Sequence, residues 1–199
     1  KHIKDAIRFS VEIGTFLYSF HAGFLLDPAV GELGKRVKKQ VLINRNEGIL
    51  RFINNVNELA LFAKDLNVSL LIENNVLSYS NYQYFSDNPF IMADAQECLR
   101  VMNETPANVS LLVDMAHLKV SSNSLGFCKV KFLELVDPFI SAYHLSDNNG
   151  LSDSNEEVRE DSWFWPHIRT DKKYYSLEIY RKDPRVLLNQ VALTDKMLQ

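Results

Sequence analysis

Five residues that could bind a divalent metal occur at equivalent places along this sequence. Each ends or directly follows a short apolar run typical of a β-strand, and the five are His21, Glu73, Asp114, His144 and Glu178. Imidazole and carboxylate groups, without thiolates, suit Mn²⁺, Mg²⁺, Co²⁺ or Zn²⁺. A cation among the three carboxylates would also relieve the repulsion between their like charges. The series therefore predicts a site for a divalent metal.

The elements that would position these residues are indicated by the spacing of apolar residues. Short runs rich in β-branched residues predict strands at 15–20, 68–72, 109–113, 139–143 and 174–177. Helical spacing predicts helices at 3–13, 49–63, 91–102 and 130–136, and Asp183 followed by Pro184 predicts the start of a last helix. The polar, acidic stretch at 148–161 predicts a surface loop. This alternation predicts parallel strands covered by helices. The carboxyl ends of parallel strands lie on one face, so the five candidate ligands would meet there.

Two of the expected strands have almost the same sequence. Residues 67–73 are NVSLLIE and residues 108–114 are NVSLLVD, with a carboxylate at the same last position. Continuous apolar runs of this kind suit strands that are buried on both faces. The repeat therefore favours a parallel barrel or a doubly wound sheet.

Taken singly, each candidate ligand also has a structural explanation. A polar residue after a strand commonly caps the following helix, and a single histidine is commonly a neutral, hydrogen-bonded side chain. Five such residues in register favour the metal site. His117 follows Asp114 closely enough to return over the same strand end and bind metal or substrate.

Composition and charge exclude several classes of protein. At roughly 150 residues per domain, 199 residues correspond to one domain or slightly more. With 46% hydrophobic and 24% charged residues the chain is not disordered, and a net charge of −3 makes nucleic acid an unlikely partner. No apolar run is long enough to span a bilayer and no signal peptide is evident, so we expect a cytoplasmic protein. Cys98 and Cys128 have no metal-binding spacing and are expected to be core thiols.

The segments around the candidate ligands resemble those of one known family. FHAG (20–23), LLIEN (70–74), LLVDMAHLK (111–119), YHLSDNNG (143–150) and SLEIY (176–180) are similar to the motif series of the xylose isomerase-like TIM barrels. That superfamily contains sugar and sugar-phosphate isomerases and epimerases, and nucleases of the endonuclease-IV type that act at apurinic sites. The resemblance implies an α/β fold of the TIM (β/α)8 type, which usually takes about 250 residues. Because the first helix would then precede the third strand, we expect residues 1–199 to form a single barrel domain without its first two strands.

The resemblance also implies roles for individual residues. Glu73, Asp114, His144 and Glu178 match the four metal ligands of the family's ketose epimerases. In those enzymes the two glutamates also act as the catalytic pair, one removing a proton and the other returning it on the opposite face. The implied function is a divalent-metal-dependent isomerase or epimerase of a small sugar or sugar phosphate, working through a metal-stabilised enediolate. Whether the protein forms a homo-oligomer is left open.

Five further residues are candidates for contact with the substrate or a second metal, namely His21, His117, Asp147, Asp153 and Trp163. His117 matches a substrate-binding histidine of the epimerases and a zinc ligand of the nucleases, and His21 matches a zinc ligand of the nucleases. Trp163 could stack on a sugar ring or anchor its loop on the outer helices. The basic run at 35–39 could contact phosphate or form a solvated helix face.

Two other functions stay open, and one departure from the family pattern bears on them. Members with three zinc ions carry D-x-H where this sequence has Asp153, Ser154 and Asn155. An amide oxygen binds zinc poorly, so this change counts against a full three-metal cluster. His21 and His117 favour a metal-dependent phosphodiesterase of the apurinic-site nuclease type as the second candidate, which Asn155 and the acidic net charge weaken. A degenerate barrel that acts as a binding module is the third.

Overall fold

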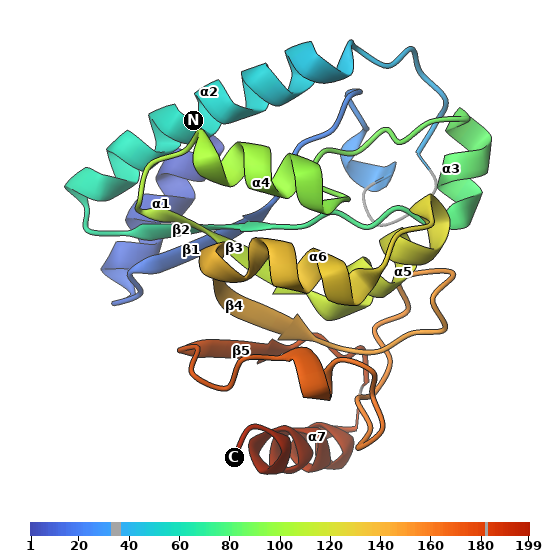
Figure 1. Ribbon diagram of the computed structural model, residues 1–199. Helices are drawn as coiled ribbons and strands as arrows, with labels where there is room; N and C mark the ends of the chain where they lie inside the picture. Colours follow the sequence, from blue (N-terminus) through green and yellow to red (C-terminus); the bar gives the residue numbers. More distant parts are fainter. Residues whose placement is uncertain (33–36, 182) are drawn as a thin grey trace.

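A computed structural model describes residues 1–32, 37–181 and 183–199, and its centre is a half-barrel of five parallel strands (Figure 1). The strands are β1 (Leu17–His21), β2 (Ser69–Glu73), β3 (Val109–Asp114), β4 (Ile140–Leu145) and β5 (Tyr174–Leu177). They are hydrogen-bonded in sequence order, each parallel to the next. The partial TIM barrel expected from the sequence is confirmed.

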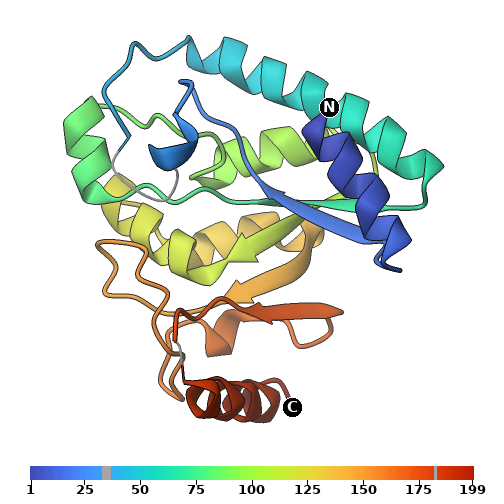
Figure 2. The ribbon, with the colours of Figure 1, turned by 180° about the vertical axis from the view of Figure 1, so that it is seen from behind.

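Helices connect and cover these strands. They are α1 (His2–Glu12), α2 (Arg45–Asp65), α3 (Tyr79–Phe85), α4 (Ala95–Asn103), α5 (Met115–Leu125), α6 (Lys129–Val136) and α7 (Pro184–Met197), with 3-10 turns η1 (Val30–Glu32), η2 (Asp137–Phe139) and η3 (Trp165–His167). Helix α1 packs against α2 and α4 packs against α6, while α7 lies beyond β5 (Figures 1 and 2).

Successive side chains on each strand face opposite sides of the sheet, and both sides are apolar. On the helix side, residues such as Ile72, Val113 and Tyr143 belong to the main core. On the inner side, Leu71 and Leu112 form a smaller cluster with Ala142 and Leu17. Burial on both faces explains why the strand sequences are apolar without alternation.

The strand register is staggered as a barrel requires. His21 lies beside Glu73 and Asp114 beside His144, but Glu73 lies beside Leu112 and His144 beside Ser176. The register therefore steps by two residues between β2 and β3, and again between β4 and β5. A step of two preserves the face, because side chains alternate with a period of two. The candidate ligands consequently remain on the inner side of successive strands.

One irregularity in β4 decides where its histidine points. The pairing of β4 with β3 skips Ser141. Ile140, before the skip, packs in the core on the helix side, whereas Ala142, after it, joins the inner cluster. An extra residue in one strand changes the face that the following residues present. His144 therefore faces the interior together with Ala142.

The helix expected at 91–102 begins later than the apolar spacing predicted. Helix α4 starts at Ala95, because Met92 has a φ of 61° and cannot continue a helix. Asp94 caps it by accepting a hydrogen bond from the Glu97 N–H at 3.0 Å. The short helices α3 and α5 were not expected at all, since neither has a long apolar stripe.

Three other expectations also need correction. The segment at 148–161 is not simply a surface loop, because Asn155 and Val158 are buried. Cys128 is exposed rather than in the core, whereas Cys98 is buried as expected. Residues 35 and 36 of the basic run lie outside the described residues, and 37–39 form irregular chain rather than a helix. In the described part of the chain, no helix combines the length and apolar character needed to cross a membrane.

Leu111→Ala should destabilise the protein by about 2–5 kcal/mol, because Leu111 is fully buried in the main core and its truncation leaves a cavity. Leu61→Ala is the matched control, since Leu61 is 64% exposed on α2 and should change the free energy of unfolding by less than about 0.5 kcal/mol. Urea denaturation of both variants measures the difference. Equal losses of unfolding free energy in the two variants would contradict the assignment of Leu111 to the helix-side core.

Candidate metal centre

Four of the predicted ligands meet at the carboxyl ends of β2 to β5. Glu73, Asp114, His144 and Glu178 each offer one donor atom, and these atoms all lie within 4.8 Å of one another. His144 is at the centre, because its Nδ1 lies 3.1 Å from Glu178 Oε2, 3.3 Å from Glu73 Oε1 and 3.8 Å from Asp114 Oδ2. We call these four residues the central cluster.

Three donor atoms of the central cluster are buried and have no hydrogen-bond partner among the described residues. They are Glu73 Oε1, Asp114 Oδ2 and His144 Nδ1. Buried polar atoms without partners are costly and therefore rare in folded proteins. Two carboxylate oxygens and one imidazole nitrogen that converge in this way are a suitable donor set for a divalent metal. The residues present therefore fit a metal ion.

Asp114 serves two purposes with its two oxygens. Its Oδ1 accepts a hydrogen bond from the His117 N–H at 2.7 Å and so caps α5. Its Oδ2 is the atom that faces the central cluster. The capping and ligand interpretations of this residue are therefore compatible.

Asn74 orients Asp114, and sequence reasoning did not identify it. Its Oδ1 accepts a hydrogen bond from the Asp114 N–H at 2.8 Å, and its Nδ2 donates to the Asp114 carbonyl at 3.3 Å. Asn74 is itself buried, and it follows Glu73 directly. A second polar residue after the strand end was the signal available in the sequence.

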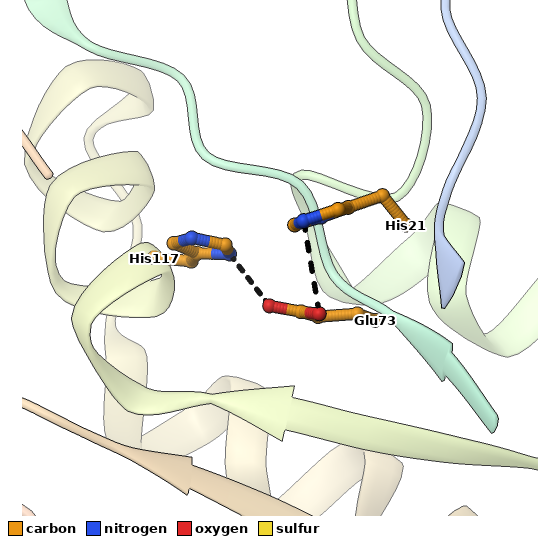
Figure 3. A group of neighbouring side chains, drawn as sticks. All are labelled: His21, Glu73 and His117. Carbon is orange, nitrogen blue, oxygen red and sulfur yellow. Dashed lines mark ion pairs between the residues drawn. The ribbon is translucent and has the colours of Figure 1, made fainter. Parts of the chain in front are cut away.

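A second group of donors shares Glu73 with the central cluster. Figure 3 shows Glu73 between His21 and His117. Its Oε2 is 3.8 Å from His21 Nε2, and its Oε1 is 3.5 Å from His117 Nδ1. The two imidazole rings are stacked with their centroids 5.6 Å apart. We call these three residues the outer group, whose donor atoms also lie within 4.8 Å of one another.

His117 is also close to a residue from the long segment after β4. Its Nδ1 is 2.9 Å from the Asn74 carbonyl oxygen, and its Nε2 is 3.3 Å from Asp153 Oδ2. His117 is buried and Asp153 is partly exposed. Asp153 therefore lies at the edge of the outer group, next to His117.

Burial and charge affect the pKa values of the site in opposite directions. Burial raises the pKa of Asp114 to about 7, against the opposing effect of His117. Burial alone would lower the pKa of His144, but the Glu178, Glu73 and Asp114 carboxylates outweigh it and raise that pKa to about 10. His144 in turn holds the pKa of Glu178 at about 2. The crowded carboxylates thus require a positive charge between them.

Asp147 and Trp163 lie in other surroundings. The Asp147 carboxylate accepts hydrogen bonds from Lys119 Nζ at 2.6 Å and from the Ser162 hydroxyl at 2.9 Å. These bonds hold the segment after β4 against α5. Trp163 packs against the main core, and Lys129 Nζ lies 4.9 Å from the centre of its ring. These are the contacts of a loop anchor. A role of either residue in substrate binding stays a prediction.

The sequence of residues 1–169 matches the family model of the xylose isomerase-like TIM barrel. The chain belongs to this family. No curated protein matches it in sequence. The half-barrel of parallel strands is therefore consistent with the barrel fold of this family.

Solved structures of the TIM-barrel type are similar in fold. A D-tagatose 3-epimerase-like protein has a TM-score of 0.71 at 16% identity, over 98% of this chain and 67% of that one. A D-psicose 3-epimerase in the presence of D-fructose has a TM-score of 0.64 at 14% identity, over 99% and 69%. An AP endonuclease of family 2 from Brucella melitensis has a TM-score of 0.66 at 11% identity, over 98% and 66%. The chain thus spans about two thirds of each of these proteins.

Lys119→Met should destabilise this xylose isomerase-like barrel by about 3 kcal/mol, because it leaves the buried Asp147 carboxylate without its cation. Lys131→Met is the control, since its ion pair with Glu134 is exposed on α6 and contributes little. Urea denaturation at neutral pH measures both. A loss no larger than that of the control would contradict the structural role of the Lys119 and Asp147 pair.

The loss from Lys119→Met should shrink in acid. Burial tends to raise the pKa of Asp147, but Lys119, the Asn148 N–H and Ser162 together lower it below its ordinary value. The pair therefore stabilises the folded state above the ordinary pKa of about 4, and this contribution is lost as the pH falls through the lowered pKa. The free energies of unfolding of the wild type and the variant should therefore approach each other as the pH is lowered from 7 to below the ordinary pKa of about 4.

Proposed function

We propose that this chain carries the metal ligands and the acid/base residues of a divalent-metal-dependent isomerase or epimerase of sugars or sugar phosphates. The observation that carries the proposal is the central cluster, in which predicted ligands from successive strands converge and three donor atoms are buried without partners. The similarity to structures described as sugar epimerases supports the substrate class. Because the chain spans about two thirds of those proteins, the activity is proposed for the protein that contains it.

The central cluster would hold Mn²⁺, Mg²⁺, Co²⁺ or Zn²⁺ through Glu73, Asp114, His144 and Glu178. When bound, such a metal supplies Lewis acidity that makes the C–H bond between a carbonyl and a hydroxyl group easier to deprotonate. Asn74 and the cap of α5 hold Asp114 with its second oxygen toward the cluster. That pre-organisation reduces the rearrangement needed on binding.

Glu73 and Glu178 would transfer the proton. They come from β2 and β5, with β3 and β4 between them, so they approach the cluster from two sides. One carboxylate would remove the proton from carbon, and the other would return a proton to the opposite face. A carboxylate must be ionised to act as the base, and His144 favours the ionised form of Glu178. His21 and His117 of the outer group, with Asp153 at its edge, would contact the substrate.

Divalent metal should stabilise the folded protein. Mn²⁺, Co²⁺ or Zn²⁺ at about one hundred times its dissociation constant should raise the free energy of unfolding by about 2.7 kcal/mol. Asp114→Asn should abolish this increase, because it replaces a charged ligand oxygen by an amide. Asp161→Asn, at an exposed ion pair with Arg159, should keep it. Thermal or urea unfolding with and without metal measures the effect, and no stabilisation of the wild type by any of these metals would refute the metal centre.

Glu178→Gln should slow exchange of a substrate C–H with deuterated water by about 10²–10⁴-fold, because glutamine cannot accept the proton. NMR of D-fructose or D-tagatose incubated with the full-length, metal-loaded protein detects this exchange. Glu160→Gln is a suitable control, since Glu160 forms an exposed ion pair with Lys196. Exchange by Glu178→Gln at the wild-type rate would show that Glu178 is not the base.

The outer group favours a second candidate function. His21, Glu73 and His117 could hold a further metal, and a structure described as an AP endonuclease of family 2 is similar in fold. Metal analysis of protein purified without chelator separates the candidates. Two or more zinc ions per chain would favour a phosphodiesterase, and one Mn²⁺, Mg²⁺ or Co²⁺ would favour the isomerase. If no metal binds under any loading condition, a binding module is the remaining candidate.

A further inference from the structure

The two carboxylates assigned to proton transfer are held very differently. Glu73 is 6% exposed and lies against three imidazoles, those of His21, His117 and His144. The Glu178 side chain is 31% exposed, and its Oε2 faces His144. Glu178 also stands just beyond the end of β5 rather than inside a strand. Its side chain therefore has more freedom to leave the central cluster.

Tyr180 supplies the contact to the other oxygen of Glu178. The Tyr180 hydroxyl donates a hydrogen bond to Glu178 Oε1 at 3.4 Å. The backbone around it is fixed on two sides, because the Glu178 N–H donates to the Leu145 carbonyl at 3.1 Å and the Tyr180 N–H donates to the Asn155 carbonyl at 3.1 Å. The ring is 68% exposed, so burial of the ring does not account for its placement.

We propose that Tyr180 is a positioning residue for Glu178, whose hydroxyl holds Oε1 and thereby keeps Oε2 directed at the central cluster. The effect of Tyr180 on metal binding and catalysis rests on the proposed function, whereas its hydrogen bond to Glu178 does not. A phenol is protonated at neutral pH, so it donates to the carboxylate without neutralising its charge. Glu178 can therefore be held in place and still act as a ligand and a base.

The contact can be tested without metal or substrate. In protein labelled with ¹³C at the tyrosine Cζ position, the Tyr180 resonance is assigned by its absence from Tyr180→Phe. Removing the acceptor by Glu178→Ala should shift that resonance, because the phenol loses its hydrogen bond to a carboxylate. An unchanged resonance would overturn the proposal.

The consequence for the cluster is tested with Co²⁺. Tyr180→Phe should bind Co²⁺ about 10-fold more weakly and change its visible absorption band, because an outer partner of a ligand has been removed. Tyr174→Phe is the matched control, at the opposite end of β5, and should behave as the wild type. Because Tyr180 is exposed, thermal unfolding of Tyr180→Phe should match the wild type. Co²⁺ affinity and spectrum both equal to the wild type would also overturn the proposal.

The two tests separate this inference from the proposed function. A wild-type protein that binds no Co²⁺ refutes the metal centre, while the tyrosine resonance still decides whether Tyr180 holds Glu178. If the wild type binds Co²⁺ and the Tyr180→Phe variant binds it in the same way, the metal centre stands and the positioning role is refuted. With D-fructose as the probe, Tyr180→Phe should lower the turnover number rather than raise KM, since Glu178 acts on the reacting carbon.

Discussion

The crowding of three carboxylates around one imidazole is the constraint on which the rest of the site depends. Glu73, Asp114 and Glu178 converge on His144 at the end of a half-barrel, where Asp114 is completely buried. Buried like charges are costly unless a positive charge stands among them or one of them takes up a proton. The carboxylates raise the pKa of His144 and so favour its charged form, and a divalent metal would provide the positive charge in its place.

The geometry of the sheet brings the carboxylates together although their like charges repel one another. Steps of two residues in the register keep successive ligands on the inner face while displacing them along the barrel axis. The skip at Ser141 then turns His144 inward. Without it, the alternation of β4 would direct the imidazole into the helix-side core, and the carboxylates would lose their central partner.

The segment after β4 is anchored on α5 and reaches the outer group. Asp147 is tied to Lys119 on α5, and its backbone forms a bridge with Glu156. Between these anchors the chain carries Asp153 to His117. This polar, acidic segment thus has two kinds of buried contact, since Asp153 meets the charged site and Val158 packs in the main core.

The sequence by itself determined the order of the five strands and of every helix except α3 and α5, the family, and the series of candidate ligands, because apolar periodicity and strand-end polarity are local properties. It did not determine the contacts of Asn74 or Tyr180, the anchoring of Asp147, or the later start of α4. Those depend on which strands are neighbours, how far they are staggered and which backbone groups lack partners. The contacts of Asn74 and Asp147 join residues far apart in the chain, and the backbone conformations at Tyr180 and Met92 are not specified by apolar periodicity, so only the tertiary structure decided them.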